Sequence, residues 1–453
     1  MRDASTTPFW LDRPRPAEAA PLGGAIEADL AIVGGGFTGL WAAVLAKRER
    51  PEREVVLLEA ETAGWGASGR NGGFVDASLT HGLANGASRF AAELDALEAA
   101  GRANLAELKA DLERHRIDAA WEEPGLLSVA TQPHELTDLH EEVALLRRFG
   151  WDADVLDRDA ARAEVASPTY LGAIRQRTGV GLVDPGALAL GLRRAALALG
   201  VGIHERTPVT RAAPGALTTP GGSVRARRVL LATGAYPPLT RAIRRLVAPV
   251  YDYVLVTEPL TAAQRADLSW ERRQGIADRG NQFHYYRLTP DGRVLFGGYD
   301  AIYHFGNRVS PRLDRRPESF ALLYDHLLAT FPALEGIAVT HAWGGPIDTC
   351  SRFCVTFGRA LGGSAVFAVG YTGLGVAASR FGARTALDLL DGADTDRTRL
   401  KLVRSRPLPF PPEPARWAVI QATRRALARA DEHGGRRGPW LRLLDRLGLG
   451  FDT

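Results

Sequence analysis

The sequence contains few cysteines, and this shortage excludes two classes of protein. Cys350 and Cys354 are the only two thiols of the chain. They are too few for the disulfide framework of a small secreted domain or for the four ligands of a structural zinc site. We therefore expect no metal centre and interpret both cysteines as small core residues.

Long apolar runs are missing as well. The first residues contain no apolar leader, and the most apolar helical pattern, residues 186–200, is interrupted by Arg193 and Arg194. Neither pattern is typical of a signal peptide or a membrane span. We therefore predict a cytoplasmic protein.

Lysine is nearly absent, so arginine carries almost all the positive charge. The formal net charge is +4, yet the residues from Arg397 onward hold 13 basic and 5 acidic side chains, whereas the rest holds 43 basic and 47 acidic. A basic tail can contact an anionic membrane or RNA. Helices packed on their own domain are the commoner outcome, so we expect no nucleic acid and no membrane contact.

Residues 29–61 have the pattern strand, glycine turn, helix, strand. Gly34, Gly36 and Gly39 fit the spacing G-x-G-x-x-G, which alone is a weak signal. Glu59 follows twenty residues later, where a dinucleotide fold places an acid on a ribose hydroxyl. Together these residues favour a nucleotide-binding turn over a flexible bend.

The rest of the chain alternates helical and strand patterns. Helices are expected near 88–114, 134–149, 186–199 and 317–330, and a short strand is expected to end near Val209. Alternating, aromatic-rich strands fill 247–305, with a hairpin turn at 290–292. A second strand, glycine turn and helix follow at 364–390.

These patterns predict an α/β fold, α+β overall, with a Rossmann-like nucleotide domain and an inserted antiparallel-sheet substrate domain. A length of 453 residues with 45% apolar content suits two interleaved domains. We assign 25–115, 175–245 and 340–395 to the nucleotide domain and 116–174 and 246–339 to the substrate domain. Residues 396–453 form a proline-rich, basic helical tail.

Five segments resemble the D-amino acid oxidase family of FAD-dependent oxidoreductases. They are "AIVGGGFTG", the strand ending in Glu59, "GASGRNGG", "VLLATGAY" and "VGYTGLGVAASR". The segments "FWLDRP", "HYYRLTPDGRVLFGGYD" and "AWGGPID" resemble its gamma-glutamylputrescine oxidoreductase-like branch. The resemblance covers about residues 9–395.

This resemblance implies FAD and a set of residues that hold it. The glycine turn would line the pyrophosphate, Glu59 would hold the ribose, and the late glycine turn would face the flavin edge where charge develops on reduction. The expected cofactor-binding residues are Gly34, Gly36, Phe37, Thr38, Gly39, Glu59, Ala60, Ala67, Ser68, Gly69, Arg70, Asn71, Gly72, Gly73, Val209, Thr233, Gly234, Gly373, Leu374, Gly375 and Val376. Covalent attachment in the sarcosine-oxidase branch uses a cysteine near Gly344 or Gly345, so the later cysteines of this chain predict non-covalent FAD.

The family reaction implies hydride transfer from the amine-bearing carbon to flavin N5, giving an imine that hydrolyses. An aromatic pocket suits it, because desolvation lowers the pKa of the amine. The candidates for the walls and catalysis are His284, Tyr285, Tyr286, Arg287 and Trp343. For each of them, packing within the sheet is an equally good interpretation.

Two departures from the family pattern narrow the range of possible substrates. Pro346 occupies the position of the arginine that anchors an amino acid carboxylate, and Ala377 that of a lysine in sarcosine-oxidase-like members. We therefore expect a small-molecule amine as substrate, with O2 or another electron acceptor. Two alternatives remain: an amino acid oxidase or dehydrogenase anchored by Arg70 or Arg287, and a flavoprotein whose basic tail docks to membrane or RNA.

Overall fold

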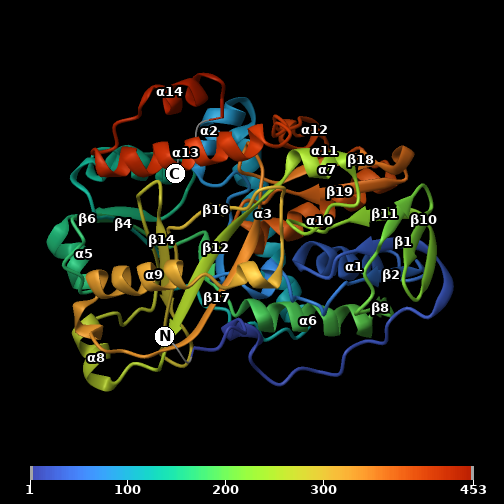
Figure 1. Cartoon of the computed structure of the whole chain (residues 1–453), viewed down its shortest axis with the longest axis horizontal. Helices are drawn as coiled ribbons and strands as arrows, with labels where there is room; N and C mark the ends of the chain where they lie inside the picture. The colour runs from blue at the N-terminus through green and yellow to red at the C-terminus, as the bar shows by residue number, and fades with distance from the viewer. Residues whose placement is uncertain (1–3, 450–453) are drawn as a thin grey trace.

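The computed structural model describes residues 4–449, whose strands form two large sheets that lie side by side in Figure 1. The first sheet has the order β18-β19-β11-β1-β2-β8. Its central pairings, β19 with β11, β11 with β1, β1 with β2 and β2 with β8, are parallel. Its strands are β1 (Gly24–Val33), β2 (Val55–Leu58), β8 (Gly202–His204), β9 (Arg211–Ala213), β10 (Ala216–Thr219), β11 (Gly222–Leu231), β18 (Thr356–Ala360) and β19 (Ala365–Val369).

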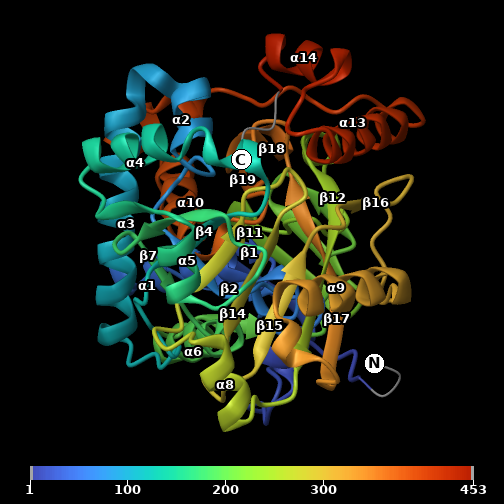
Figure 2. The ribbon, with the colours of Figure 1, turned by 90° about the vertical axis from the view of Figure 1, so that its left-hand side faces the viewer.

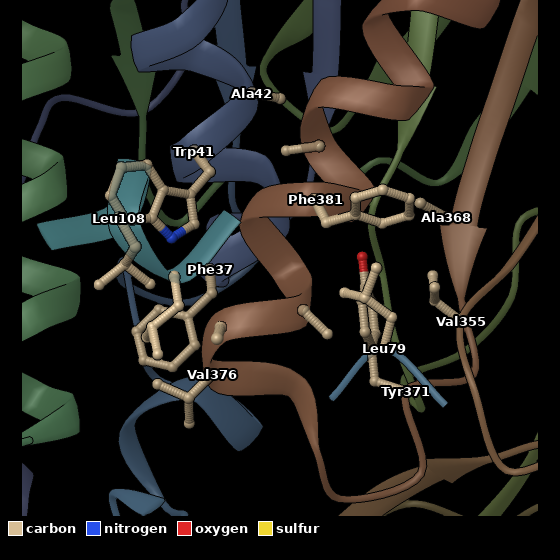
Figure 3. Packing of buried hydrophobic residues seen from close by; sticks show 14 of the residues in the cluster. Phe37, Trp41, Ala42, Leu79, Leu108, Val355, Ala368, Tyr371, Val376 and Phe381 are labelled. Atoms are coloured by element: carbon tan, nitrogen blue, oxygen red, sulfur yellow. The ribbon is translucent and has the colours of Figure 1, made fainter. Parts of the chain in front are cut away.

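Helix α1 (Phe37–Glu49) packs against this sheet and against two neighbouring helices, α10 (Gly375–Asp391) and α6 (Pro185–Ala198). It is apolar on nearly every side, and all its residues from Phe37 to Lys47 are buried. Phe37 and Trp41 belong to the same buried cluster as Phe381 of α10 (Figure 3). Burying a large apolar side chain contributes about 1.5–3 kcal/mol, so this cluster holds the glycine turn before α1 in position.

The second sheet has the order β16-β12-β15-β14-β13-β4-β6-β5, with β17 paired to β12. All its pairings are antiparallel except that of β13 with β4. The predicted turn at 290–292 joins two of its strands. Its strands are β4 (Leu126–Ala130), β5 (Ala153–Leu156), β6 (Gly172–Gln176), β12 (Ala248–Thr257), β13 (Gly275–Asp278), β14 (His284–Leu288), β15 (Val294–Gly298), β16 (Ile302–Tyr303) and β17 (Val339–Thr349), and a separate pair is β3 (Phe74–Asp76) with β7 (Val180–Leu182).

The remaining helices surround the two sheets, and the last two form a hairpin at one side of the molecule (Figure 2). Within residues 4–449, no helix combines the length and the apolarity that a membrane span requires. The helices are α2 (Leu83–Phe90), α3 (Leu94–Arg114), α4 (Leu139–Arg148), α5 (Arg158–Glu164), α7 (Arg241–Leu246), α8 (Ala262–Leu268), α9 (Pro317–Thr330), α11 (Asp396–Arg399), α12 (Lys401–Arg404), α13 (Ala415–Glu432) and α14 (Pro439–Arg446).

Four local predictions differ from the structure. The helix expected over 88–114 is two helices, α2 and α3, joined by a 3-10 turn at Ala91–Glu93, and the helix over 134–149 is a 3-10 turn followed by α4. The strand expected to end near Val209 ends at His204. Strand β17 pairs with β12, so residues 339–349 belong to the second sheet, although 340–349 were assigned to the nucleotide domain. Residues 339–349 show only the pattern of a strand ahead of a glycine turn. Strands of both sheets can have this pattern, so the sequence does not show which sheet these residues join.

Candidate active site

A cavity of about 1110 Å³ lies between the two sheets. This volume exceeds the range of about 300–1000 Å³ that is usual for a small-molecule site. Its walls come from the glycine turn, the 65–76 loop, the ends of β12 and β14, the 370–376 turn and the C-terminal hairpin. The cavity is large enough to hold a long cofactor together with a second ligand.

The three glycines of the first turn have three different structural roles. Gly34 has φ +108°, and a Cβ there would lie 2.4 Å from the carbonyl oxygen of Ala232. At Gly39 a Cβ would lie 1.9 Å from the oxygen of Gly34, so this glycine lets α1 pack against the turn. At Gly36 the nearest atom is Ser68 Oγ at 3.0 Å, and Gly36 faces the cavity. These roles match a tight bend, close helix packing and close approach of a ligand to the backbone.

Glu59, at the end of β2, is bound to this turn. Its Oε2 accepts a hydrogen bond from the backbone N–H of Gly35 at 2.5 Å, and its Oε1 accepts one from Glu61 N–H at 2.8 Å. Burial raises the pKa of the Glu59 carboxyl, although these two backbone hydrogen bonds lower it. The carboxylate lines the cavity, where its remaining lone pairs can accept from hydroxyl groups.

Two helices point their N-termini into the cavity. The first residues of α1 line one part of it, and those of α10 line another. Within the described residues neither helix has an acidic side chain in its first turn or a side-chain cap at its N-cap residue. Two helix N-termini with exposed partial positive charge favour an anionic ligand.

The loop that precedes α10 is fixed by a buried carboxylate. Asp348 Oδ2 accepts a hydrogen bond from Gly370 N–H at 2.7 Å, and burial raises the pKa of Asp348 to about 6. Cys350 also lines the cavity, and its Sγ donates to the carbonyl oxygens of Cys354 and Gly370 at 3.1 and 3.3 Å. Both cysteines are buried and unpaired, in a turn after β17.

Most of the expected cofactor-binding residues line this single cavity. Gly39, Gly69 and Gly73 do not, because each packs against backbone: a Cβ would lie 2.3 Å from Gly64 O at Gly69, and 2.2 Å from Val183 O at Gly73. The residues of the expected set that line it are Gly34, Gly36, Phe37, Thr38, Glu59, Ala60, Ala67, Ser68, Arg70, Asn71, Gly72, Val209, Thr233, Gly234, Gly373, Leu374, Gly375 and Val376.

Tyr285 and Trp343 are the two wall candidates that face the cavity. The Tyr285 ring lies between Gly72 and Gly297, where an added Cβ would come within 2.8 and 2.7 Å of it. Its hydroxyl donates to Asp252 Oδ2 at 2.5 Å. Trp343 Nε1 donates to the carbonyl oxygen of Arg70 at 2.9 Å.

His284, Tyr286 and Arg287, the other three candidates for the walls, are not among the residues that line the cavity. Side chains alternate along β14, and His284 and Tyr286 face away from Tyr285. His284 contacts His326 of α9, with Nε2 and Nδ1 2.8 Å apart, and Tyr286 stacks on Phe296. Arg287 is fully buried.

The two arginines considered as carboxylate anchors are already bound within the protein. Arg287 donates to the Val183 carbonyl at 2.7 Å, and burial lowers its pKa to about 10. Arg70 lines the cavity, but its Nη1 forms an ion pair of 2.6 Å with Asp314 and donates to Gly344 O at 3.0 Å. Neither guanidinium has the open bidentate face that a substrate carboxylate prefers.

Sequence reasoning missed the carboxylates of the cavity. Asp300 and Asp348 end the motifs "FGGYD" and "GGPID", and Asp252 lies within an aromatic strand. An acid within or directly after an apolar strand is the signal that could have identified these three. The missed carboxylates that line the cavity are Glu61, Asp76, Asp252, Asp278, Asp300, Asp314 and Asp348.

Known proteins resemble this chain over most of its length. The family model described as "DAO: FAD dependent oxidoreductase" matches residues 29–389. The gamma-glutamylputrescine oxidoreductase of Escherichia coli K12 is 32% identical over 411 residues, covering 86% of this chain and 89% of its own. A probable oxidoreductase OrdL of Haemophilus influenzae is 28% identical over 403 residues, covering 85% and 88%.

Among solved structures, glycine oxidase from Geobacillus kaustophilus has the same fold. Its TM-score is 0.68 at 23% sequence identity, and the match covers 84% of this chain and 99% of that chain. The cofactor of the family is FAD, and the cavity fits it. Two helix N-termini suit its pyrophosphate and its electron-rich ring edge, and a buried acid at the end of β2 suits its ribose.

Proposed function

This chain is a member of the DAO family of FAD-dependent oxidoreductases, and on that premise we propose that it oxidises the C–N bond of an amine rather than of an α-amino acid. The chemistry that bound FAD supplies is acceptance of a hydride at N5 from the amine-bearing carbon, which leaves an imine that hydrolyses. Gly36 and the first residues of α1 would hold the pyrophosphate, Glu59 would hold the ribose, and the 373–376 turn would hold the flavin edge. O2 or another acceptor takes the electrons.

The observation that carries this proposal is the charge of the cavity lining. Among residues 4–449, eight carboxylates line it, against three guanidiniums. An amine arrives as an ammonium ion, which such a lining attracts, whereas an α-carboxylate next to the reacting carbon is repelled. The carboxylates are Glu59, Glu61, Asp76, Asp252, Asp278, Asp300, Asp314 and Asp348, and the guanidiniums are Arg70, Arg424 and Arg437.

Asp252 and Tyr285 are the pair that removes the ammonium proton in this proposal. The amine must be neutral before its carbon can lose a hydride. Burial raises the pKa of Asp252 to about 6, and Tyr285 Oη lies 2.5 Å from its Oδ2. A proton passes from the substrate nitrogen to Tyr285 Oη while the hydroxyl proton moves to Asp252 Oδ2, so Asp252 needs to be ionised beforehand.

Aromatic side chains exclude water from the same region. Tyr285 and Trp343 line the cavity together with Tyr251 and Tyr236. A dry, aromatic wall lowers the pKa of an amine and so assists its deprotonation. It also delays attack of water on the imine until the product reaches solvent.

A matched set of substrates tests the proposal. We would mix the flavin-loaded protein anaerobically with 1-aminopentane or norleucine, and with 2-phenylethylamine or phenylalanine, and follow flavin absorbance. The members of each pair differ only in the α-carboxylate. We expect the amine of at least one pair to reduce the flavin about tenfold faster or more, the ratio that about 1.4 kcal/mol produces. Faster reduction by the amino acid of both pairs would contradict the proposal.

A further inference from the structure

Three neighbouring strands of the first sheet end at the same edge, beside the cavity. Strand β11 is paired in parallel with β1 on one side and with β19 on the other, so all three run in the same direction. Strand β1 leads into the first glycine turn, and β19 leads into the 370–376 turn before α10. Strand β11 leads into residues 232–236, which therefore lie between the two turns that are assigned to the cofactor.

Contacts on both sides agree with this position of the 232–236 segment. A Cβ at Gly34 would lie 2.4 Å from the carbonyl oxygen of Ala232, and a Cβ at Gly234 would lie 3.9 Å from Asp348 Oδ2. Asp348 is the carboxylate that holds the loop before α10, through the N–H of Gly370. Because adjacent strands are about 4.8 Å apart, the ends of β1 and β19 are separated by about 10 Å, with this segment between them.

The 232–236 segment carries two hydroxyl groups without a partner in the protein. The oxygen atoms Thr233 Oγ1 and Tyr236 Oη are buried, and neither forms a hydrogen bond with any of residues 4–449. Both residues line the cavity. A buried hydroxyl that stays unpaired costs about 1–3 kcal/mol. Two such groups on one turn therefore indicate that a ligand of the cavity supplies their partners.

The Tyr236 side chain is held in place by its neighbours. An added Cβ at Gly66 would lie 2.8 Å from Cε2 of its ring, and the ring contacts that of Trp65 with the centroids 5.6 Å apart. The Arg70 guanidinium lies over the Trp65 ring, 4.5 Å from its centroid. Tyr236 therefore binds a ligand with little loss of side-chain freedom.

The surroundings of Tyr236 suit a neutral group with hydroxyls better than a phosphate. Burial raises the pKa of Tyr236, so its hydroxyl keeps its proton and can donate. The charge of Arg70 is balanced by Asp314, with 2.6 Å between Nη1 and Oδ2. In FAD the segment between the pyrophosphate and the flavin ring is the ribityl chain, whose hydroxyl groups both donate and accept. Threonine and tyrosine hydroxyls can pair with such groups in either direction.

We propose that the hydroxyl groups of Thr233 and Tyr236 bind the ribityl chain of FAD and so fix the flavin ring relative to its pyrophosphate. This inference rests on the part of the proposed function that assigns the first glycine turn to the pyrophosphate and the 373–376 turn to the flavin edge. It does not depend on which substrate is oxidised. The sequence predicts Thr233 among the cofactor-binding residues, and the unpaired hydroxyl adds Tyr236.

Two variants that each remove one hydroxyl provide the test, Tyr236→Phe and Thr233→Val. We would dialyse the FAD-loaded, full-length protein to equilibrium to obtain the Kd of FAD. Displacement of FAD by ADP, which has the pyrophosphate but no ribityl chain, then gives the Kd of ADP. Each variant should raise the Kd of FAD about 3- to 10-fold, the loss expected for one hydrogen bond. The Kd of ADP should stay within about twofold of that of the unaltered protein.

The matched control is Thr385→Val, because Thr385 Oγ1 is also buried and unpaired within residues 4–449 but belongs to α10 outside the cavity lining. It should leave both constants unchanged. A Kd of FAD within about twofold of the unaltered protein in both test variants would overturn the inference. A Kd of ADP that rises as much as that of FAD would also overturn it, since the hydroxyls would then contact the adenosine or pyrophosphate half. Failure of amines to reduce the flavin would contradict the proposed function and leave these constants as expected.

Discussion

Replacing Gly36 by alanine separates the cofactor role of the glycine turn from its folding role. The backbone of Gly36 is extended, at φ −79° and ψ −175°, which alanine adopts without strain. The added Cβ would meet only Ser68 Oγ, at 3.0 Å, and this hydroxyl accepts from Phe37 N–H at 2.8 Å.

The cost in the cofactor-free protein is therefore small. Losing that hydrogen bond costs about 0.5–1.5 kcal/mol, and the reduced freedom of the unfolded chain returns about 0.4–1 kcal/mol. We expect the free energy of unfolding to change by less than about 1 kcal/mol. A methyl group forced against the pyrophosphate costs about 1–3 kcal/mol, which corresponds to a rise of about 5- to 150-fold in the Kd of FAD.

The assay is a fluorescence titration of cofactor-free protein with FAD, combined with thermal unfolding without FAD. Gly23→Ala is the matched control, because nothing lies within 4 Å of its added Cβ. Gly39→Ala should instead destabilise the fold itself, since its Cβ would lie 1.9 Å from backbone. A Kd for Gly36→Ala within about twofold of the unaltered protein would refute the assignment of this turn to the pyrophosphate.

Three further predictions concern the cavity. Burial raises the pKa of the Asp252 carboxyl to about 6, and this carboxyl must be ionised to receive the proton through Tyr285, so kcat/KM of the unaltered enzyme should fall below a pH of about 6. Asp252→Asn should remove this fall. An unchanged pH profile would contradict the role of Asp252. Acid denaturation should release all the flavin into the supernatant, because burial raises the pKa of Cys350 and so disfavours its thiolate; flavin in the protein pellet would contradict non-covalent binding. Arg287→Met should lower the melting temperature, because it leaves the buried carbonyl of Val183 unpaired at a cost of about 1–3 kcal/mol. The ratio of the flavin reduction rates with 1-aminopentane and norleucine should not change. A changed ratio would show that Arg287 anchors the substrate.

The sequence predicted the nucleotide half of the molecule better than the substrate half. Gly34, Gly36 and Glu59 lie within one short βαβ unit, where local spacing determines what meets in space. The late turn before α10 repeats the same local pattern. Both could therefore be predicted from the residues alone.

The substrate half depends on contacts between segments far apart in the chain. Asp252 meets Tyr285 across strands β12 and β14, which are not adjacent in the sheet. The position of Arg424 depends on how the tail folds back over residues 281–306, and charge counts alone suggested a nucleic-acid or membrane surface as an alternative. The sequence shows that side chains along β14 alternate between the two faces of the sheet, but it does not show which of these faces lines the cavity.

The most direct test of the account is anaerobic reduction of the flavin by an amine. The purified protein, loaded with FAD, is mixed without oxygen with N-butyryl-1,4-diaminobutane and with 1-aminopentane, and flavin absorbance is followed together with aldehyde and ammonia. The account predicts loss of the absorbance and an amount of aldehyde and ammonia equal to the flavin reduced. A protein that binds no FAD, or a flavin that amino acids reduce and amines leave oxidised, would contradict it.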